Sequence, residues 1–360
     1  MDDRSKYLYV CDTLADMNDV DGFLGVITRS CLDEYVRDND ARTIPIVHSV
    51  GHVDHLVDDD IVAINSRSGM VRTLFRPQSN NNALFLTERC NNNCLMCSQP
   101  PRNDRDEEFL GMALRLVGMI PQDTANIAIT GGEPTLLGNG LLDVISDCKT
   151  QLPNTNITIL TNGRMFYYRS YVKRLSDIEH PHLMLAIPLY SDVPEQHNQI
   201  VRSEEAFQQS VLGIYNLGAH NQDIEVRIVL HALNFKRLPH LCEFIYRNLP
   251  FISHVAIMGM EVTGYARKNL GQLWIEPYDY SGQLVEGVEF LATRGMNVSI
   301  YNTPLCILPE PVWKYARQSI SDWKTIYLEE CSKCQVKDKC GGLFQTSGQK
   351  YSQHIHAVLS

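Results

Sequence analysis

From residue 83 onward, the chain alternates short apolar segments with longer segments of helical periodicity. The apolar segments are rich in Ile, Val, Leu and Ala, and they predict strands at 83–88, 126–130, 156–160, 183–189, 224–231 and 254–258. The intervening segments predict helices at 107–119, 139–150, 165–176, 204–217 (with Ser203 as its N-cap) and 236–247. Repeated strand–helix units predict an α/β fold, in which a parallel sheet with helices outside curves into a full or partial barrel. Such folds carry their catalytic groups at the carboxyl ends of the strands.

Two further segments flank this core. Residues 1–82 contain short mixed runs and end in a turn-rich stretch, which predicts a small β-rich N-terminal element. Residues 83–295 form the predicted core, with a further helix at about 278–293. Residues 296–360 begin with a strand-like run and continue as a cysteine-bearing extension. We therefore predict three parts, with boundaries after residues 82 and 295.

Charge and hydropathy restrict the partners and the compartment. The chain carries 32 Lys and Arg against 42 Asp and Glu, a net charge of −10, which argues against a large phosphate-binding surface and a nucleic-acid partner. No apolar run approaches the roughly 18 residues of a membrane span, and the first residues lack the apolar stretch of a secretion signal. We therefore expect a cytoplasmic protein, whose eleven cysteines stay reduced and serve metals rather than disulfides.

Three cysteines follow the first predicted strand with the spacing C-x3-C-x2-C: Cys90, Cys94 and Cys97. An iron–sulfur cube prefers a thiolate on every iron, so three thiolates leave one iron open to a small molecule. Such an open iron makes a reaction centre. The alternative is a zinc ion with a histidine as fourth ligand. No histidine lies between His55 and His180, so that ligand would have to come from a distant part of the chain.

The second predicted strand ends in the run Gly131-Gly132-Glu133-Pro134. Glycine has no Cβ, so a Gly-Gly pair lets the backbone approach a ligand closely. Glu133 adds an acceptor at the same edge of the sheet. A Gly-Gly pair alone more often marks a turn, and its position one strand–helix unit after the cysteine loop gives this run its specificity.

Polar residues also mark three other predicted strands. Thr161 and Asn162 follow the third strand and Ser191 follows the fourth, where each could bind a ligand or cap a turn. Arg227 stands among apolar neighbours within the fifth strand. It lies either on an exposed strand face or inside the barrel, where a guanidinium needs a carboxylate partner.

The cysteine loop and the Gly-Gly-Glu run together resemble the radical S-adenosylmethionine (radical SAM) enzymes. The resemblance implies a 4Fe–4S cluster on Cys90, Cys94 and Cys97 that binds SAM and cleaves it reductively to a 5′-deoxyadenosyl radical, which abstracts a substrate hydrogen. It also implies SAM contacts by residues at the strand tips and in the cysteine loop: Met96, Gly131, Gly132, Glu133, Pro134, Thr161, Asn162, Ser191 and Arg227. Among them, Met96 would pack on the adenine, although a core position fits a methionine equally well.

A second group of cysteines lies near the C-terminus: Cys331, Cys334 and Cys340, with the spacing C-x2-C-x5-C. This spacing resembles the SPASM or Twitch extensions of peptide-modifying radical SAM enzymes, which hold auxiliary clusters. The longer SPASM pattern continues with a cysteine where this chain has Phe344, so a second auxiliary cluster is not expected. Cys306 could complete one four-thiolate 4Fe–4S site, and a structural zinc ion is the alternative occupant.

Several runs resemble one subgroup, the radical SAM maturases of His-Xaa-Ser repeat peptide systems. They include the segments 94–101, 188–192, 237–239 and 319–324. The resemblance implies a ribosomally made peptide substrate, a sister radical SAM protein and an electron donor as partners. A radical SAM enzyme acting on a small molecule or RNA, or a non-catalytic partner of a sister maturase, remain alternatives.

Overall fold

The computed structural model describes residues 8–11, 25–28, 46–47, 54–65, 70–102, 106–318, 325–347 and 350–359. The contacts between residues divide the chain into two compact units, Met1–Gln78 and Ser79–Ser360. Of the segments used above, 319–324 lies outside the described residues.

The described part of the first unit is built from short strands. Three of them form a parallel sheet in the order β1-β2-β3, with the bounds Leu8–Cys11, Gly25–Thr28 and Ile46–Val47. Strands β4 (Ile61–Asn65) and β5 (Met70–Phe75) pair as an antiparallel hairpin.

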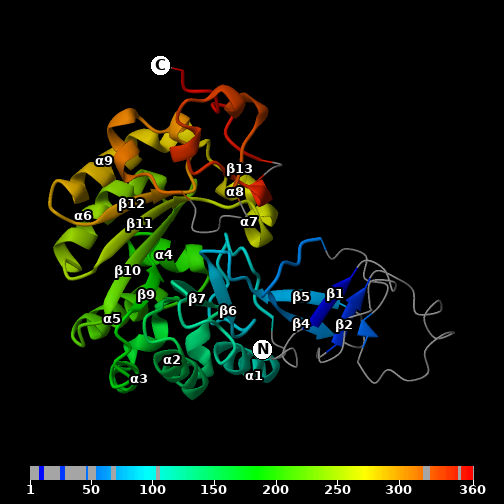
Figure 1. The fold of residues 1–360 in the computed structure, drawn as a ribbon. Coiled ribbons are helices and arrows are strands. Elements are labelled where there is room, and N and C mark those ends of the chain that lie inside the picture. The colour runs from blue at the N-terminus through cyan, green and yellow to red at the C-terminus, as the bar shows by residue number, and fades with distance from the viewer. Residues whose placement is uncertain are drawn as a thin grey trace, which may run out of the picture. The chain divides into compact units, whose positions relative to one another are not determined.

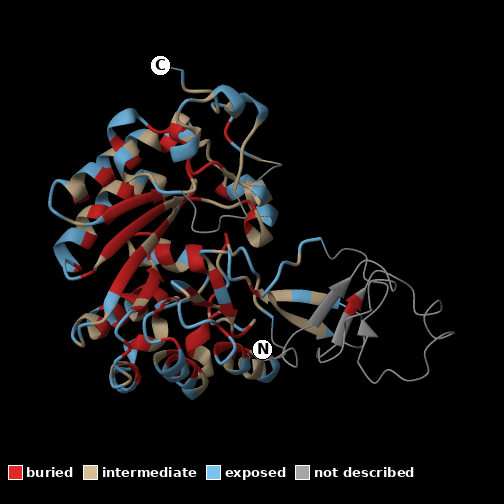
Figure 2. Cartoon of the chain, in the orientation of Figure 1, coloured by how far each residue is buried: buried red, intermediate tan, exposed pale blue. Residues whose placement is uncertain are grey.

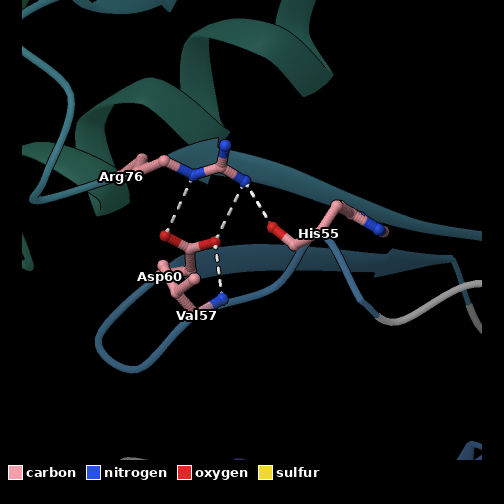
Figure 3. Close-up of polar contacts among 4 residues, drawn as sticks. All are labelled: His55, Val57, Asp60 and Arg76. Carbon is pink, nitrogen blue, oxygen red and sulfur yellow. Dashed lines mark hydrogen bonds and ion pairs between the residues drawn. The ribbon is translucent and has the colours of Figure 1, made fainter. Parts of the chain in front are cut away.

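An arginine at the end of this hairpin ties its two flanks together (Figure 3). Arg76 Nη2 donates to the carbonyl of His55 at 2.7 Å and lies 3.3 Å from the Asp60 carboxylate, whose side chain is almost fully buried. The same carboxylate accepts from Val57 N at 3.3 Å. Asp60 therefore stabilises both the turn that leads into β4 and the end of β5.

The second unit contains a seven-stranded parallel sheet in the order β12-β11-β10-β9-β8-β7-β6 (Figure 1). Its strands in chain order are Asn82–Phe85, Asn126–Thr130, Asn156–Leu160, Leu183–Pro188, Asp223–Leu230, His254–Gly259 and Val298–Tyr301. Strands β6 and β12 are the two edges, so the curved sheet stays open. The predicted α/β fold with a partial barrel is confirmed, and the strand-like run after residue 295 provides a seventh strand.

The helices of this unit flank the sheet, and most of them cover its outer face (Figure 1). They are α1 to α9, with the bounds Asp106–Val117, Asn139–Gln151, Arg169–Ser176, Pro194–Val201, Ala206–Gly218, Leu238–Asn248, Gly264–Lys268, Leu270–Leu273 and Ser281–Ala292. Helix α4 was not predicted. The predicted cap at Ser203 is wrong, because α5 begins after Glu205 and Ser203 contacts the cysteine loop instead.

The two faces of the strands differ in chemistry, as the period of two along a strand requires. Along β10, Val226 and Ile228 are buried, whereas Arg227 and Val229 alternate with them on the other face. Val229 packs against the cluster that contains Leu95 and Met96 of the cysteine loop. This face of β10 therefore points toward the cysteine loop, while the sheet as a whole is deeply buried (Figure 2).

The C-terminal part of the unit is built from short elements. Strands β13 (Thr325–Ile326) and β14 (Leu343–Phe344) pair antiparallel. The described 3-10 helices of the unit are Pro134–Leu137, Arg164–Tyr167, Phe235–Arg237, Pro277–Tyr280, Leu305–Ile307, Glu310–Tyr315, Glu329–Lys333, Lys337–Lys339 and Gln345–Ser347. Among the described residues, no helix has both the length and the apolar character needed to span a membrane.

Candidate functional site

The cysteine loop begins shortly after β6, at the carboxyl edge of the sheet. Its three cysteines, Cys90, Cys94 and Cys97, are all partly buried free thiols within electrostatic range of one another. Burial raises the pKa of Cys90 to about 11 and also raises the pKa of Cys94 and Cys97. Clustered thiols that resist ionisation become thiolates when a metal cation compensates their charge, so this donor set fits a metal cluster.

Helices α4 and α7 hold the cysteine loop in place through backbone hydrogen bonds. Backbone N–H groups of Asn93 and Leu95 donate to carbonyls at the end of α4, at 3.0 and 2.9 Å. At the start of α7, Tyr265 N donates to the Cys97 carbonyl at 2.8 Å. Gly264 precedes this contact with φ of 51°, and a Cβ there would lie 2.4 Å from the Ser98 carbonyl oxygen. Glycine is required at this position both for its conformation and for this close approach.

The two glycines of the Gly-Gly-Glu run also serve a close backbone contact. A Cβ on Gly131 would lie 2.5 Å from the Thr87 carbonyl oxygen, and one on Gly132 would lie 2.3 Å from that of Arg89. The backbone N–H of Gly132 donates to Thr87 O at 2.8 Å. The glycines thus let the end of β7 lie directly against the segment that leads into the cysteines.

Glu133 is completely buried at the same edge. Its Oε1 accepts from the Thr135 hydroxyl and the Thr161 hydroxyl, each at 2.6 Å, and its Oε2 accepts from Asn162 N at 2.6 Å. Burial raises the pKa of Glu133, although these hydrogen bonds favour the carboxylate. Glu133 therefore joins the tips of β7 and β8, and Pro134 begins the 3-10 helix that follows. A contact of Glu133 with the SAM amino group stays a prediction, for which a lone pair of Oε2 remains.

The tip of β8 reaches the cysteine loop directly. Asn162 Nδ2 donates to Asn91 Oδ1 at 2.6 Å and lies 4.0 Å from Cys90 Sγ. Arg164 Nη1 donates to the Asn91 carbonyl at 2.6 Å and to Asn92 Oδ1 at 2.8 Å. Arg164 was not predicted as a site residue, because no local pattern reveals a contact with a loop more than seventy residues earlier.

Met96 and Ser191 occupy buried positions beside the loop. Met96 packs in an apolar cluster with Leu95, Tyr190 and Leu273, where it can serve the core and also face a flat ring. Ser191 Oγ donates to Gln196 Oε1 at 2.6 Å and accepts from Val193 N at 3.0 Å, so it organises the turn into α4. SAM contacts by these two residues stay predictions.

Arg227 lies on the face of β10 that points toward the cysteine loop and already has a carboxylate partner. Its Nε lies 2.5 Å from Glu225 Oε1, and the other oxygen of Glu225 lies 2.7 Å from His254 Nδ1. His254 Nε2 in turn lies 2.9 Å from the Ser299 hydroxyl. Burial opposes ionisation of Glu225, but His254 and Arg227 outweigh it and lower its pKa. The contact of Arg227 with the SAM carboxylate stays a prediction, and the ion pair with Glu225 is made by the Nε atom of Arg227.

The four C-terminal cysteines meet at one place. One cavity is lined by Cys306, Cys331, Cys334 and Cys340, together with apolar residues. Backbone N–H groups point at the sulfurs: Leu305 N lies 3.4 Å from Cys340 Sγ and Val358 N lies 3.4 Å from Cys334 Sγ. Such N–H···S contacts stabilise thiolate ligands of a cluster.

The chain's last residues supply a part of this cavity that the sequence did not reveal. His356 lines the cavity, with its Nδ1 2.8 Å from the His354 carbonyl oxygen. The spacing of His354 and His356 in the sequence did not indicate that either residue lies near the four cysteines.

Four thiolates suit either a single metal ion or a 4Fe–4S cube. In the part of the chain that the structure describes, no three Cys, His, Asp or Glu side chains are grouped as ligands of one metal ion. A 4Fe–4S cube takes each thiolate on a different iron, so its ligands spread over a wider space.

Residues 84–245, which include the cysteine loop, the Gly-Gly-Glu run and the tips of β7 to β10, match the model of the radical SAM superfamily. This segment is a radical SAM domain. The radical SAM family implies a 4Fe–4S cluster and SAM, and the partly buried thiols of the cysteine loop have the donor chemistry that such a cluster needs.

Two proteins that resemble this chain are distant from it in sequence. An uncharacterised protein of Methanocaldococcus jannaschii is 27% identical over 169 residues, which are 45% of this chain and 56% of that protein. Streptococcus suis SuiB bound to S-adenosylmethionine has a TM-score of 0.51 at 15% identity, covering 69% of this chain and 55% of SuiB. SuiB bound to the precursor peptide SuiA gives 0.50 at 16% identity, covering 62% and 49%. The chain thus spans about half the length of these relatives, and the similarity to SuiB shows the fold.

Proposed function

We propose that this protein is a radical SAM maturase that modifies a ribosomally made peptide of the His-Xaa-Ser repeat type. The observation that carries the proposal is the convergence of Cys90, Cys94 and Cys97 with Glu133 and Asn162 at the carboxyl edge of the sheet. In a parallel α/β sheet, this edge is where ligands and reacting groups bind. The proposed ligands of the SAM-binding cluster are these three cysteines.

The protein residues have three tasks in this scheme. The cluster, when bound, supplies the electron that cleaves SAM to the 5′-deoxyadenosyl radical, and the chain binds, orients and shields the reactants. We assign SAM binding to the cysteine loop at Met96, the Gly131–Pro134 run, Thr161, Asn162 and Ser191, and Arg227. The buried apolar cluster around Met96 and Tyr190 excludes water on one side of the loop.

A second cluster is proposed for the C-terminal cavity. Four thiols, Cys306, Cys331, Cys334 and Cys340, line one space, which matches the four ligands of a fully ligated 4Fe–4S cube. A fully ligated cube transfers electrons, so the extension would serve as an auxiliary site. The proposed partners are the peptide, an electron donor and a sister radical SAM protein.

The peptide assignment draws on the sequence resemblance and on the fold. SuiB, which shares this fold, has been crystallised with a precursor peptide. A cavity also opens at the ends of β10 to β12, where Trp274, Tyr280 and Tyr351 line it. Its walls include Leu273 and Met260, which pack against the cluster around the cysteine loop. A side chain of a bound peptide could therefore approach the loop.

The proposal is tested by anaerobic reconstitution with iron and sulfide, followed by SAM and a reductant. The wild-type protein should produce 5′-deoxyadenosine, and Cys94→Ala should abolish it, because the cube loses one of its three thiolates. Cys148→Ala, a change at a buried cysteine of α2 far from the loop in sequence, serves as the control. Unchanged 5′-deoxyadenosine from Cys94→Ala, or zinc in place of iron at the loop, would refute the assignment.

A further inference from the structure

A cation on the tip of β8 contacts the cysteine loop and takes no part in the assignments above. Arg164 begins the 3-10 helix Arg164–Tyr167, directly after Gly163, whose φ of 78° turns the chain out of β8. This turn directs the guanidinium toward the segment between Cys90 and Cys94.

The guanidinium joins three parts of the fold. Its Nη1 lies 2.6 Å from the Asn91 carbonyl oxygen, 2.8 Å from Asn92 Oδ1 and 2.7 Å from the Ser203 hydroxyl, and its Nε donates to Gln209 Oε1 at 2.7 Å. Asn91 and Asn92 belong to the cysteine loop, Ser203 to the α4–α5 turn and Gln209 to α5. All four acceptors are neutral, so no carboxylate cancels the charge of Arg164 through these contacts.

The charge of Arg164 also reaches the thiols. Burial lowers the pKa of Arg164, while Cys90, the carboxylates of Glu133 and Glu205, and Cys94 lie close enough to oppose that effect. The group remains a cation at any physiological pH, because an arginine guanidinium keeps its proton far above that range. A fixed positive charge therefore stands beside the three-cysteine loop, where a reduced cluster would add negative charge.

We propose that Arg164 is a positioning residue of the SAM-binding cluster, which fixes the Asn91–Asn92 segment by hydrogen bonds and raises the cluster's reduction potential by its charge. The inference rests on the proposed function, because it requires the cluster at Cys90, Cys94 and Cys97. Groups around cluster ligands tune both affinity and potential, and their replacement commonly costs about 10- to 100-fold in metal affinity or activity.

Three variants separate the two effects. Arg164→Gln removes the charge and most of the hydrogen bonds, Arg164→Lys keeps the charge but loses the fork geometry, and Arg169→Gln is the control on the exposed side of the next helix. Each reconstituted protein is analysed for bound iron and, by redox titration, for the midpoint potential of the electron paramagnetic resonance signal that SAM perturbs. Circular dichroism reports whether each variant is folded.

We expect Arg164→Gln to lower the midpoint potential and to bind iron about 10-fold more weakly than Arg169→Gln. Arg164→Lys should also bind iron more weakly but keep a potential near that of the wild type, because the charge remains. If Arg164→Gln fails to fold, the iron binding of Arg164→Lys alone tests the role of Arg164, and we expect it to be weaker than in the wild type.

Two results overturn the inference. The first is that both Arg164 variants bind iron as tightly as Arg169→Gln and have the same midpoint potential. The second applies if Arg164→Gln does not fold: Arg164→Lys then binds iron as tightly as the wild type. A wild-type protein without a SAM-sensitive cluster would instead refute the proposed function, so the two failures are distinguishable.

Discussion

Two histidines next to the cysteine loop are buried as neutral rings. His197 and His231 both lie close to the Tyr190 ring, with centroid distances of 5.7 and 6.4 Å. Each Nδ1 accepts from a backbone N–H, of Tyr190 and of Leu233 respectively, and neither Nε2 has a hydrogen-bond partner in the described structure. Burial lowers the pKa of both rings to about 4.

The depressed pKa values predict a loss of stability in acid. An unfolded histidine titrates near pH 6.5, so between about pH 6.5 and 4 the unfolded chain binds more protons than the folded one. The contribution of the two neutral histidines to the free energy of unfolding is complete above pH 6.5 and is lost as the pH falls toward 4. We expect the difference in unfolding free energy between pH 7 and pH 5 to shrink by about 2 kcal/mol in His197→Gln.

Urea denaturation at the two pH values measures this difference. His182→Gln, which changes an exposed histidine, should leave it as in the wild type. An equal difference in His197→Gln and the wild type would contradict the assigned protonation state of His197.

At the residue scale, the sequence reveals groups whose chemistry is local. The cysteine spacing and the Gly-Gly-Glu run each lie within a few consecutive residues, and the family comparison confirms the radical SAM domain that contains them. Arg164 and Glu225 could not be found in this way, since their roles depend on partners brought together by folding. For Glu225 that partner is His254, on the neighbouring strand.

At the element scale, helix α5 determines the shape of the turn that carries Arg164. A Cβ on Gly213 of α5 would lie 2.4 Å from the Gly163 carbonyl oxygen and 3.1 Å from Phe166 Cβ. A backbone oxygen cannot rotate away as a side chain can, so Gly213→Ala must displace either α5 or the turn. We expect a loss of about 1–3 kcal/mol in unfolding free energy, together with weaker iron binding through the displaced Arg164.

Chemical denaturation and iron analysis test this expectation against Gly111→Ala. Gly111 lies within α1 with no atom near its added Cβ, so alanine there should stabilise the protein by about 0.5–1 kcal/mol through helix propensity. Equal stability of the two variants would show that the α5 contact is not restrictive.

The strands of the sheet were predictable because each is a short apolar run, and their observed bounds differ from the predicted ones by a few residues at most. Helix α4 escaped prediction because Pro194–Val201 is short and largely polar. The prediction of Ser203 as an N-cap was wrong for the same reason. Because α4 was not predicted, nothing indicated that the segment between α4 and α5 turns toward the cysteine loop.

At the scale of the whole molecule, the C-terminal extension folds as a separate cysteine site on the same unit as the sheet. We expect Cys334→Ser to remove the iron of the auxiliary cluster, because serine is a poor replacement for a thiolate ligand. Cleavage of SAM in the absence of peptide should persist, since the cysteine loop is untouched. Iron and sulfide analysis, together with 5′-deoxyadenosine measurement, checks both expectations.

Cys148→Ala is again the control, and it should retain the iron of both clusters. Full iron content in Cys334→Ser, or zinc in the wild-type extension, would contradict an auxiliary iron–sulfur cluster. The spacing of Cys331, Cys334 and Cys340 predicted their grouping, with Cys306 as a possible fourth member. The approach of His356 and Val358 was not predicted, because these residues reach the cavity through tertiary contacts.

The anchoring of the cysteine loop has a consequence for how the protein matures. The loop is held by backbone contacts from α4 and α7 and by Asn162 and Arg164 from the end of β8. These anchors come together only after the sheet and its helices have assembled. A cluster bound here would therefore enter a loop that the folded chain has already shaped, whereas the zinc of a small finger domain nucleates the fold of that domain.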